Sequence, residues 1–181
     1  MTKRMSYGKF DKFIHWLMAV NIGATLYFAY GISELTNDLK LAEYGDHGLS
    51  VTTIAICLVI RTLWRAYEGF PALPASMSQI QKLAAKAMHY FLYICLCCQI
   101  VVGILLASTT EQDFIATGYN IDYSSFNLVS KELYQPLLLI HKSVYWLILA
   151  LLAIHITAAF KHHFFDKDEV LIRMLPFMKR R

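Results

Sequence analysis

Residues 137–160 read LLLIHKSVYWLILALLAIHITAAF, and this stretch decides the fold. It holds two histidines, His141 and His155, fourteen residues apart, and its only lysine, arginine or acid is Lys142. Fourteen residues make almost four turns of an α-helix, so both imidazoles leave the same face, about 21 Å apart along the axis. Such a helix would cross most of a membrane's ~30 Å hydrocarbon core. Ionisable residues inside spanning helices usually mark functional sites, although two unrelated packed histidines are the simpler alternative.

The composition predicts an all-α integral membrane protein. The chain has 181 residues, is 57% hydrophobic and has a mean hydropathy of +0.44, which is unlike an ordinary soluble domain. Its length suits one compact unit, so we expect residues 1–181 to form a single membrane domain. Four apolar stretches are long enough to span and predict a four-helix bundle: about 13–33, 48–67, 87–108 and 137–160.

The distribution of basic residues predicts the orientation. Of the 17 lysines and arginines, all but Lys40, Lys131 and Lys142 lie at the two termini or around the connection between the second and third spans. Basic residues gather on the cytoplasmic side, so both termini should be cytoplasmic. The opposite side carries eight acidic residues against three lysines, a net charge of −5. The basic termini suit anionic lipid headgroups, and we expect no nucleic-acid partner.

This topology brings two histidine pairs to two depths. His15 should lie level with His155 near the inner side, and His47 level with His141 near the outer side. Facing imidazoles in a helical bundle are what a haem with two axial histidines requires. The chain has no CxxCH motif, so each haem would be held without thioether bonds. Three glycines could let the flat ring approach the backbone: Gly23, Gly48 and Gly103.

Other polar residues near the spans have weaker interpretations. Arg61 and Arg65, four apart near the inner end of the second span, could bind haem propionates or simply reach lipid headgroups. Lys142 is the best-placed cation for an outer propionate. His89 could compete as a ligand, hydrogen-bond a propionate or simply pack. His162, after the last span, is a candidate for lipid, propionate or quinone contact.

The long outer connection, residues 109–136, is rich in aromatic residues. Loops of this length are often functional. Rings of this kind favour an aromatic belt at the membrane interface, with a docking surface for a partner as the alternative. The rings are those of Phe114, Tyr119, Tyr123, Phe126 and Tyr134.

Three segments carry a resemblance to a known family: KFIHWLM (12–18), LVIRTLWR (58–65) and AIHITAAFKHHFFDKDEVLIRMLP (153–176). In order and spacing the chain resembles the bacterial cytochrome b561 proteins, dihaem four-helix membrane cytochromes related to the cytochrome b subunits of nickel–iron hydrogenases. The resemblance implies two haem b groups, multi-pass insertion in the bacterial inner membrane and electron exchange with ubiquinone. It maps the axial ligands onto His15, His47, His141 and His155, and matches His89 to a histidine not assigned to iron.

Three functions remain open at this stage. The first is transmembrane electron transfer between ubiquinone and a partner at the outer face, for which the family suggests a dehydrogenase subunit or a periplasmic isoprenoid-binding protein; a homodimer is a further possibility. The second, suggested by some family members, is a superoxide:ubiquinone oxidoreductase. Because superoxide is an anion, the outer net charge of −5 disfavours this enzyme. The third is a non-redox scaffold.

Overall fold

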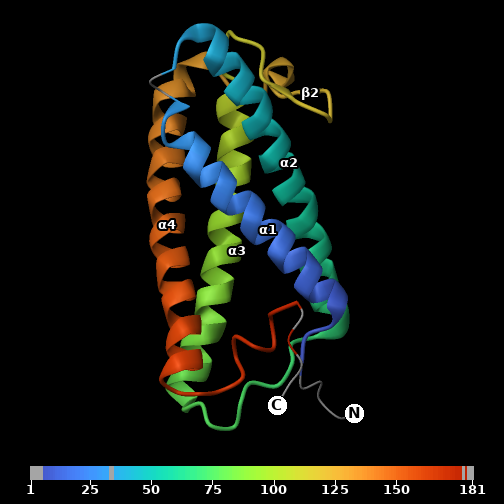
Figure 1. The fold of residues 1–181 in the computed structure, drawn as a ribbon. Coiled ribbons are helices and arrows are strands. Elements are labelled where there is room, and N and C mark those ends of the chain that lie inside the picture. The colour runs from blue at the N-terminus through green and yellow to red at the C-terminus, as the bar shows by residue number, and fades with distance from the viewer. Residues whose placement is uncertain (1–5, 33–34, 177, 179–181) are drawn as a thin grey trace.

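The computed structural model describes residues 6–32, 35–176 and 178, and it shows an all-α bundle (Figure 1). α1 crosses the other helices obliquely, while α3 and α4 run side by side along their length. The predicted all-α class is therefore confirmed. The four helices are α1 (Lys9–Ala29), α2 (Asn37–Glu68), α3 (Gln79–Ala107) and α4 (Tyr134–Phe164).

Local chemistry explains where the helices begin and end. At the start of α3, Ser78 and Gln81 form a reciprocal capping box: Gln81 N donates to Ser78 Oγ at 3.2 Å, and Ser78 N donates to Gln81 Oε1 at 2.8 Å. α2 ends at Glu68, and the next residue, Gly69, has a φ of 73°, in a region that favours glycine. α2 begins at Asn37, well before the predicted residue 48, because hydropathy registers only the apolar part of a helix that continues into polar sequence.

By length and composition, three helices of the described part of the chain could cross a membrane. These are α2, α3 and α4, so the prediction of four spans is confirmed for three. α1 is the shortest of the four helices, at 21 residues, and carries Lys9, Asp11 and Lys12 in its first turn, which leaves few residues for an uncharged span. The predicted end of the first span at Ser33, and the acidic Glu34, lie outside the described residues, as do five of the basic residues used for orientation: Lys3, Arg4, Lys179, Arg180 and Arg181.

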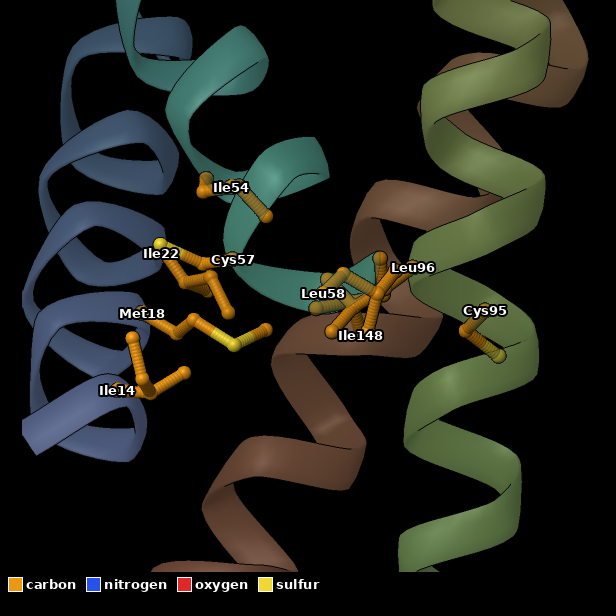
Figure 2. Close-up of a cluster of buried hydrophobic side chains, with 9 residues drawn as sticks. All are labelled: Ile14, Met18, Ile22, Ile54, Cys57, Leu58, Cys95, Leu96 and Ile148. Carbon is orange, nitrogen blue, oxygen red and sulfur yellow. The ribbon is translucent and has the colours of Figure 1, made fainter. Parts of the chain in front are cut away.

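A cluster of buried apolar side chains joins all four helices (Figure 2). Ile148 of α4 is only 2% exposed and lies midway in sequence between the two histidines of that helix. The cluster therefore forms an apolar layer between the two levels of histidine. Its remaining members are Ile14, Met18 and Ile22 of α1, Ile54, Cys57 and Leu58 of α2, and Cys95 and Leu96 of α3.

The connection between α3 and α4 is an ordered loop with some β structure, which the sequence did not predict. Strands β1 (Ile115–Ala116) and β2 (Ile121–Asp122) pair antiparallel, and two short 3-10 helices follow, η2 (Ser124–Phe126) and η3 (Lys131–Leu133). Gly118 and Asn120 turn the chain with φ values of 79° and 53°. We call residues 114–123 the hairpin loop.

The opposite end of the bundle is closed by the two ends of the described chain. Lys12 Nζ of α1 donates to the carbonyl oxygen of Leu175 at 2.8 Å. Arg173 Nη1 donates at 2.8 Å to the carbonyl oxygen of Ala72, in the connection between α2 and α3. The segment after α4 thus folds back under the helices at the same end as the start of α1 (Figure 1).

Candidate cofactor site with two facing histidine pairs

The structure brings four half-buried histidines together as two facing pairs. His15 of α1 faces His155 of α4, with ring centroids 6.5 Å apart and ring planes at 71°. His47 of α2 faces His141 of α4, with centroids 6.4 Å apart and planes also at 71°. We call His15 and His155 the termini-end pair, and His47 and His141 the hairpin-end pair. One continuous helix, α4, supplies a ring to each pair, as the spacing of fourteen residues predicts.

Both separations fit two imidazoles bound to one metal ion from opposite sides. Metal–imidazole bonds of about 2.0–2.1 Å, with each ring centroid about 1.1 Å behind its nitrogen, place two trans rings roughly 6.3 Å apart. The observed 6.4 and 6.5 Å agree with this value. Direct packing of two rings does not require the same distance twice, at two levels and from different helices. The residues present therefore fit a metal cofactor held between each pair.

The hairpin-end pair opens onto a cavity of about 400 Å³. This volume is within the range of pockets that hold small ligands and cofactors. The wall is largely apolar, with both imidazoles and a few polar side chains reaching into it, among them Thr25, Thr52 and Gln99. A flat apolar ring system with a central metal matches such a wall.

Gln99 of α3 is a polar contact in this cavity that the sequence analysis missed. Its Nε2 lies 3.1 Å from Nε2 of His141, and because the amide group is the donor, the imidazole nitrogen accepts. The other ring nitrogen, His141 Nδ1, and Gln99 Oε1 are buried without a hydrogen-bond partner among the described residues. Buried polar atoms are rarely left unpaired, so this corner of the cavity suits a polar or metal ligand.

The glycines have different roles from one another. A Cβ on Gly103 would lie 3.2 Å from Cε1 of His141, so this glycine makes room for the imidazole. A Cβ on Gly48 would instead meet Ala116 of the hairpin loop, 2.9 Å from its Cα, and a Cβ on Gly23 would meet nothing within 4 Å. Gly48 packs against the loop and also lines the cavity, so the suggestion that it lets a cofactor approach stays a prediction; Gly23 has no neighbour within 4 Å and does not line the cavity.

A third imidazole lies beside the termini-end pair. His89 of α3 has its ring centroid 5.5 Å from that of His155, and its Nδ1 lies 2.6 Å from the carbonyl oxygen of Ala85. The separation is shorter than the roughly 6.3 Å that two trans imidazoles need. His15 therefore suits the position opposite His155 better than His89 does.

The two arginines of α2 are buried and bonded to protein groups. Arg65 forms an ion pair with the carboxylate of Asp11 in α1 and donates from Nη1 to the carbonyl oxygen of Gly69 at 3.0 Å. Arg61 donates from Nε to the Tyr93 hydroxyl at 2.8 Å and from Nη1 to the carbonyl oxygen of Asp11 at 3.1 Å. Both side chains thus connect helices inside the bundle, so reaching out to lipid headgroups does not describe them.

The aromatic ring of Tyr7 lies against the Arg65–Asp11 ion pair. The guanidinium carbon of Arg65 lies 4.8 Å from the centroid of the Tyr7 ring. Burial raises the pKa of the Tyr7 hydroxyl above its ordinary value, against the opposing effect of the two arginines. Tyr7 therefore packs on the Arg65 guanidinium as a neutral ring.

Two further candidates lie at opposite ends. Lys142 is exposed and lines the cavity next to His141. His162 lies at the end of α4, where its Nδ1 is 2.7 Å from Asp168 Oδ2 and 3.2 Å from Asp166 Oδ2. Lys161 Nζ also contacts Asp166, at 2.6 Å. His162 thus belongs to a charged group that fixes the turn after α4.

The aromatic residues of the hairpin loop are placed differently from the predicted belt. Phe114 packs against His47 of α2, with centroids 6.4 Å apart, and Tyr123 contacts Thr52 through its hydroxyl at 2.8 Å. These two rings line the cavity. An interface belt therefore does not describe Phe114 and Tyr123, which face the bundle.

A membrane bundle with histidines facing each other in pairs between its helices is the arrangement of a membrane cytochrome b. The sequence profile of the family described as prokaryotic cytochrome b561 matches residues 6–177, and the chain belongs to this family. It is 29% identical over 174 residues to cytochrome b561 homolog 2 of Escherichia coli (strain K12), covering 93% of this chain and 90% of that protein. It is 26% identical over 179 residues to cytochrome b561 homolog 1 of the same organism, covering 96% and 98%. Family membership implies a multi-pass membrane protein that transfers electrons through haem b.

Proposed function

We propose that this protein carries two haem b groups, one in each histidine pair, and passes electrons between them across the membrane. His15 and His155 would bind one iron, and His47 and His141 the other. The observation that carries the proposal is the matching separation of the two pairs, 6.5 and 6.4 Å. A haem with two imidazole ligands supplies a one-electron couple and leaves no coordination position open for substrate.

The protein's own residues then do three things. α4 holds His141 and His155 about 21 Å apart along its axis, so electron transfer between the two haems would cover most of the membrane thickness. The apolar cluster around Ile148 keeps water out of the region between the levels. Arg61 and Arg65 place buried positive charge at the termini end, where propionates are the natural anionic partners.

A haem assay on single histidine variants tests this proposal. The purified wild-type protein should yield two haem b per chain in a pyridine haemochrome assay. His15→Ala and His47→Ala should each lose one haem, and not the same one, as reduced-minus-oxidised spectra and redox titrations would show. His163→Ala, which removes a histidine outside both pairs, is the matched control and should retain two. A wild type without haem, or the same loss in both variants, would sink the proposal.

We further propose ubiquinone as the electron-exchange partner, with His162 at the quinone end. The His162 imidazole lies between two carboxylates, an arrangement suited to handing on a proton while ubiquinone takes up two electrons and two protons. Mixing the reduced protein with a ubiquinone analogue should reoxidise both haems, and His162→Ala should slow this step while retaining two haems. If ubiquinone were reduced only when superoxide is supplied, the protein would be a superoxide:ubiquinone oxidoreductase instead.

We also propose that α1 completes a four-span bundle in the bacterial inner membrane, with both termini in the cytoplasm. The orientation follows from the excess of lysine and arginine at the two termini and around the connection between α2 and α3. The electron partner at the other face, a dehydrogenase subunit or a periplasmic carrier, would meet a surface of net negative charge. Reporter fusions at both termini should read out as cytoplasmic; periplasmic signals from both would reverse the orientation, and a periplasmic signal from one alone would contradict four spans.

A further inference from the structure

The hairpin loop rests on α2 at two glycines. A Cβ on Gly45 would lie 2.5 Å from Oγ1 of Thr117, and a Cβ on Gly48 would lie 2.9 Å from Cα of Ala116. Real Cβ atoms essentially never come this close to another heavy atom. Ala116 itself is fully buried, at 0% exposed. At Gly48 the backbone of the loop therefore contacts α2 at a distance that only glycine permits, whereas at Gly45 the close atom is a side-chain hydroxyl.

Polar bonds fasten the loop along the same face of α2. Thr117 N donates to the carbonyl oxygen of Gly45 at 3.0 Å. Thr52 donates its single hydroxyl hydrogen to the carbonyl oxygen of Gly48 at 2.6 Å, so in its 2.8 Å contact with Tyr123 the Tyr123 hydroxyl is the donor. The loop is thus fastened to α2 at two points after Ala116, by Thr117 at its turn and by Tyr123 after its second strand.

This fastening bears directly on the hairpin-end pair. Phe114 lies at the start of the loop, with its ring 6.4 Å from that of His47 and at 89° to it. The Cε1 of Phe114 is also 3.3 Å from the Cβ position of Gly48, the residue next to His47. Phe114 and Tyr123 both line the cavity onto which the pair opens. Displacing the loop would therefore move a wall of that cavity.

We propose that the hairpin loop, held at Gly48 and Tyr123, positions the His47 ring and keeps water from the hairpin-end pair, and so sets the reduction potential of the haem there. This inference rests on the proposed function. Solvent exposure is one of the main determinants of haem potential. Water stabilises the ferric form, which carries one more positive charge than the ferrous form, so opening the loop lowers the potential of this haem and leaves the other unchanged.

Two glycine variants test the inference. Gly48→Ala forces the loop away from α2, whereas Gly23→Ala adds the same methyl group in open space and is the matched control. In Gly48→Ala we expect the midpoint potential of one of the two haems to fall by about 59 mV. At a fixed applied potential this is a tenfold rise in the oxidised-to-reduced ratio of that haem. Its ferric spin-resonance signal should change with it, and Gly23→Ala should match the wild type in both measurements. Unchanged potentials in Gly48→Ala, or equal shifts of both haems, would overturn the inference.

Tyr123→Phe provides a second test in case Gly48→Ala loses both haems. It removes the hydroxyl that donates to Thr52 and leaves the size of the ring unchanged. We expect faster hydrogen exchange of the loop amides in the haem-loaded protein, with a potential shift in the same direction. If exchange and potential both stay as in the wild type, the loop does not have this role. A Tyr123→Phe protein that retains two haems but gives this negative result refutes the loop inference alone, whereas a wild-type protein without haem refutes the proposed function.

Discussion

Arg61 of α2 donates from Nη1 to the backbone carbonyl oxygen of Asp11 in α1, at a distance of 3.1 Å. Asp11 lies one helical turn before His15. The same guanidinium donates from Nε to Tyr93, which lies one turn after His89. Arg61 is only 7% exposed. A buried positive charge, hydrogen-bonded to two uncharged oxygens, therefore lies one turn from two imidazoles at the termini end.

This charge should raise the reduction potential of the termini-end haem, because a nearby cation stabilises the ferrous form. Arg61→Gln should lower that potential by tens of millivolts, since one nearby buried charge at an effective dielectric constant of about 20 contributes on the order of 1 kcal/mol. A spectroelectrochemical titration that resolves the two haems measures the change. Arg61→Lys keeps the charge and is the control, with a potential close to that of the wild type. If Lys and Gln lowered it equally, the hydrogen bonds and not the charge would be responsible.

Replacing His89 should leave both haems bound. Its ring lies too close to His155 for a shared metal ion, and Ala85 already engages its Nδ1. We expect His89→Ala to retain two haems per chain, with at most a modest change in one potential, while His15→Ala loses one haem. Haem content after purification measures both variants. Loss of a haem from His89→Ala together with full retention in His15→Ala would exchange the roles of the two residues.

The sequence was sufficient for the parts of the fold governed by periodicity. Fourteen residues between His141 and His155 place both rings on one face of α4, and counting basic residues then brings His15 and His47 to matching depths. The structure shows these same rings facing each other. Helical geometry and membrane thickness are strong local constraints, so such a pairing can be predicted without knowledge of side-chain packing.

The parts that could not be predicted depend on contacts between distant segments. Gly45 and Gly48 are inside α2 because the hairpin loop packs there, a contact of residues about 70 positions apart. The contact of Gln99 with His141 could not be predicted either. An amide side chain in a membrane span is unusual, but the sequence does not show which residue it contacts. Arg61 could equally have reached lipid, and only the packing of α1 and α3 shows that it bonds to protein groups.

Gly103 offers a test of the space around His141. Gly103→Ala places a methyl group 3.2 Å from the His141 ring, so the imidazole must move by a few tenths of an ångström. We expect the hairpin-end haem to be held less tightly. The measurement is the rate at which this haem is lost to an excess of a haem-free acceptor protein. Gly23→Ala, in open space on α1, should retain haem normally and gain up to about 1 kcal/mol in stability from better helix propensity. Equal haem loss in both variants would show that the effect is not local to His141.

The hairpin loop should loosen in acid because of Asp122. Its carboxylate accepts hydrogen bonds from the Ser124 hydroxyl and from the backbone N–H groups of Ser124 and Ser125. These bonds, that from the Ser124 hydroxyl first, hold the pKa of Asp122 below its ordinary value of 3.8. A lowered pKa means that the carboxylate stabilises the fold at pH values above 3.8, and that this contribution is lost as the pH falls through the pKa in the folded protein.

Hydrogen exchange of the loop amides, corrected for intrinsic rates, should therefore speed up between about pH 6 and about pH 3 in the wild type. Asp122→Asn should show the faster exchange already at the higher pH, because an amide accepts these hydrogen bonds more weakly than a carboxylate does. Asp113→Asn changes an exposed carboxylate just before the same loop and is the matched control, with exchange close to that of the wild type. If the Asp122 and Asp113 variants exchange alike, Asp122 does not hold the loop, and the tie between Tyr123 and Thr52 must be sufficient on its own.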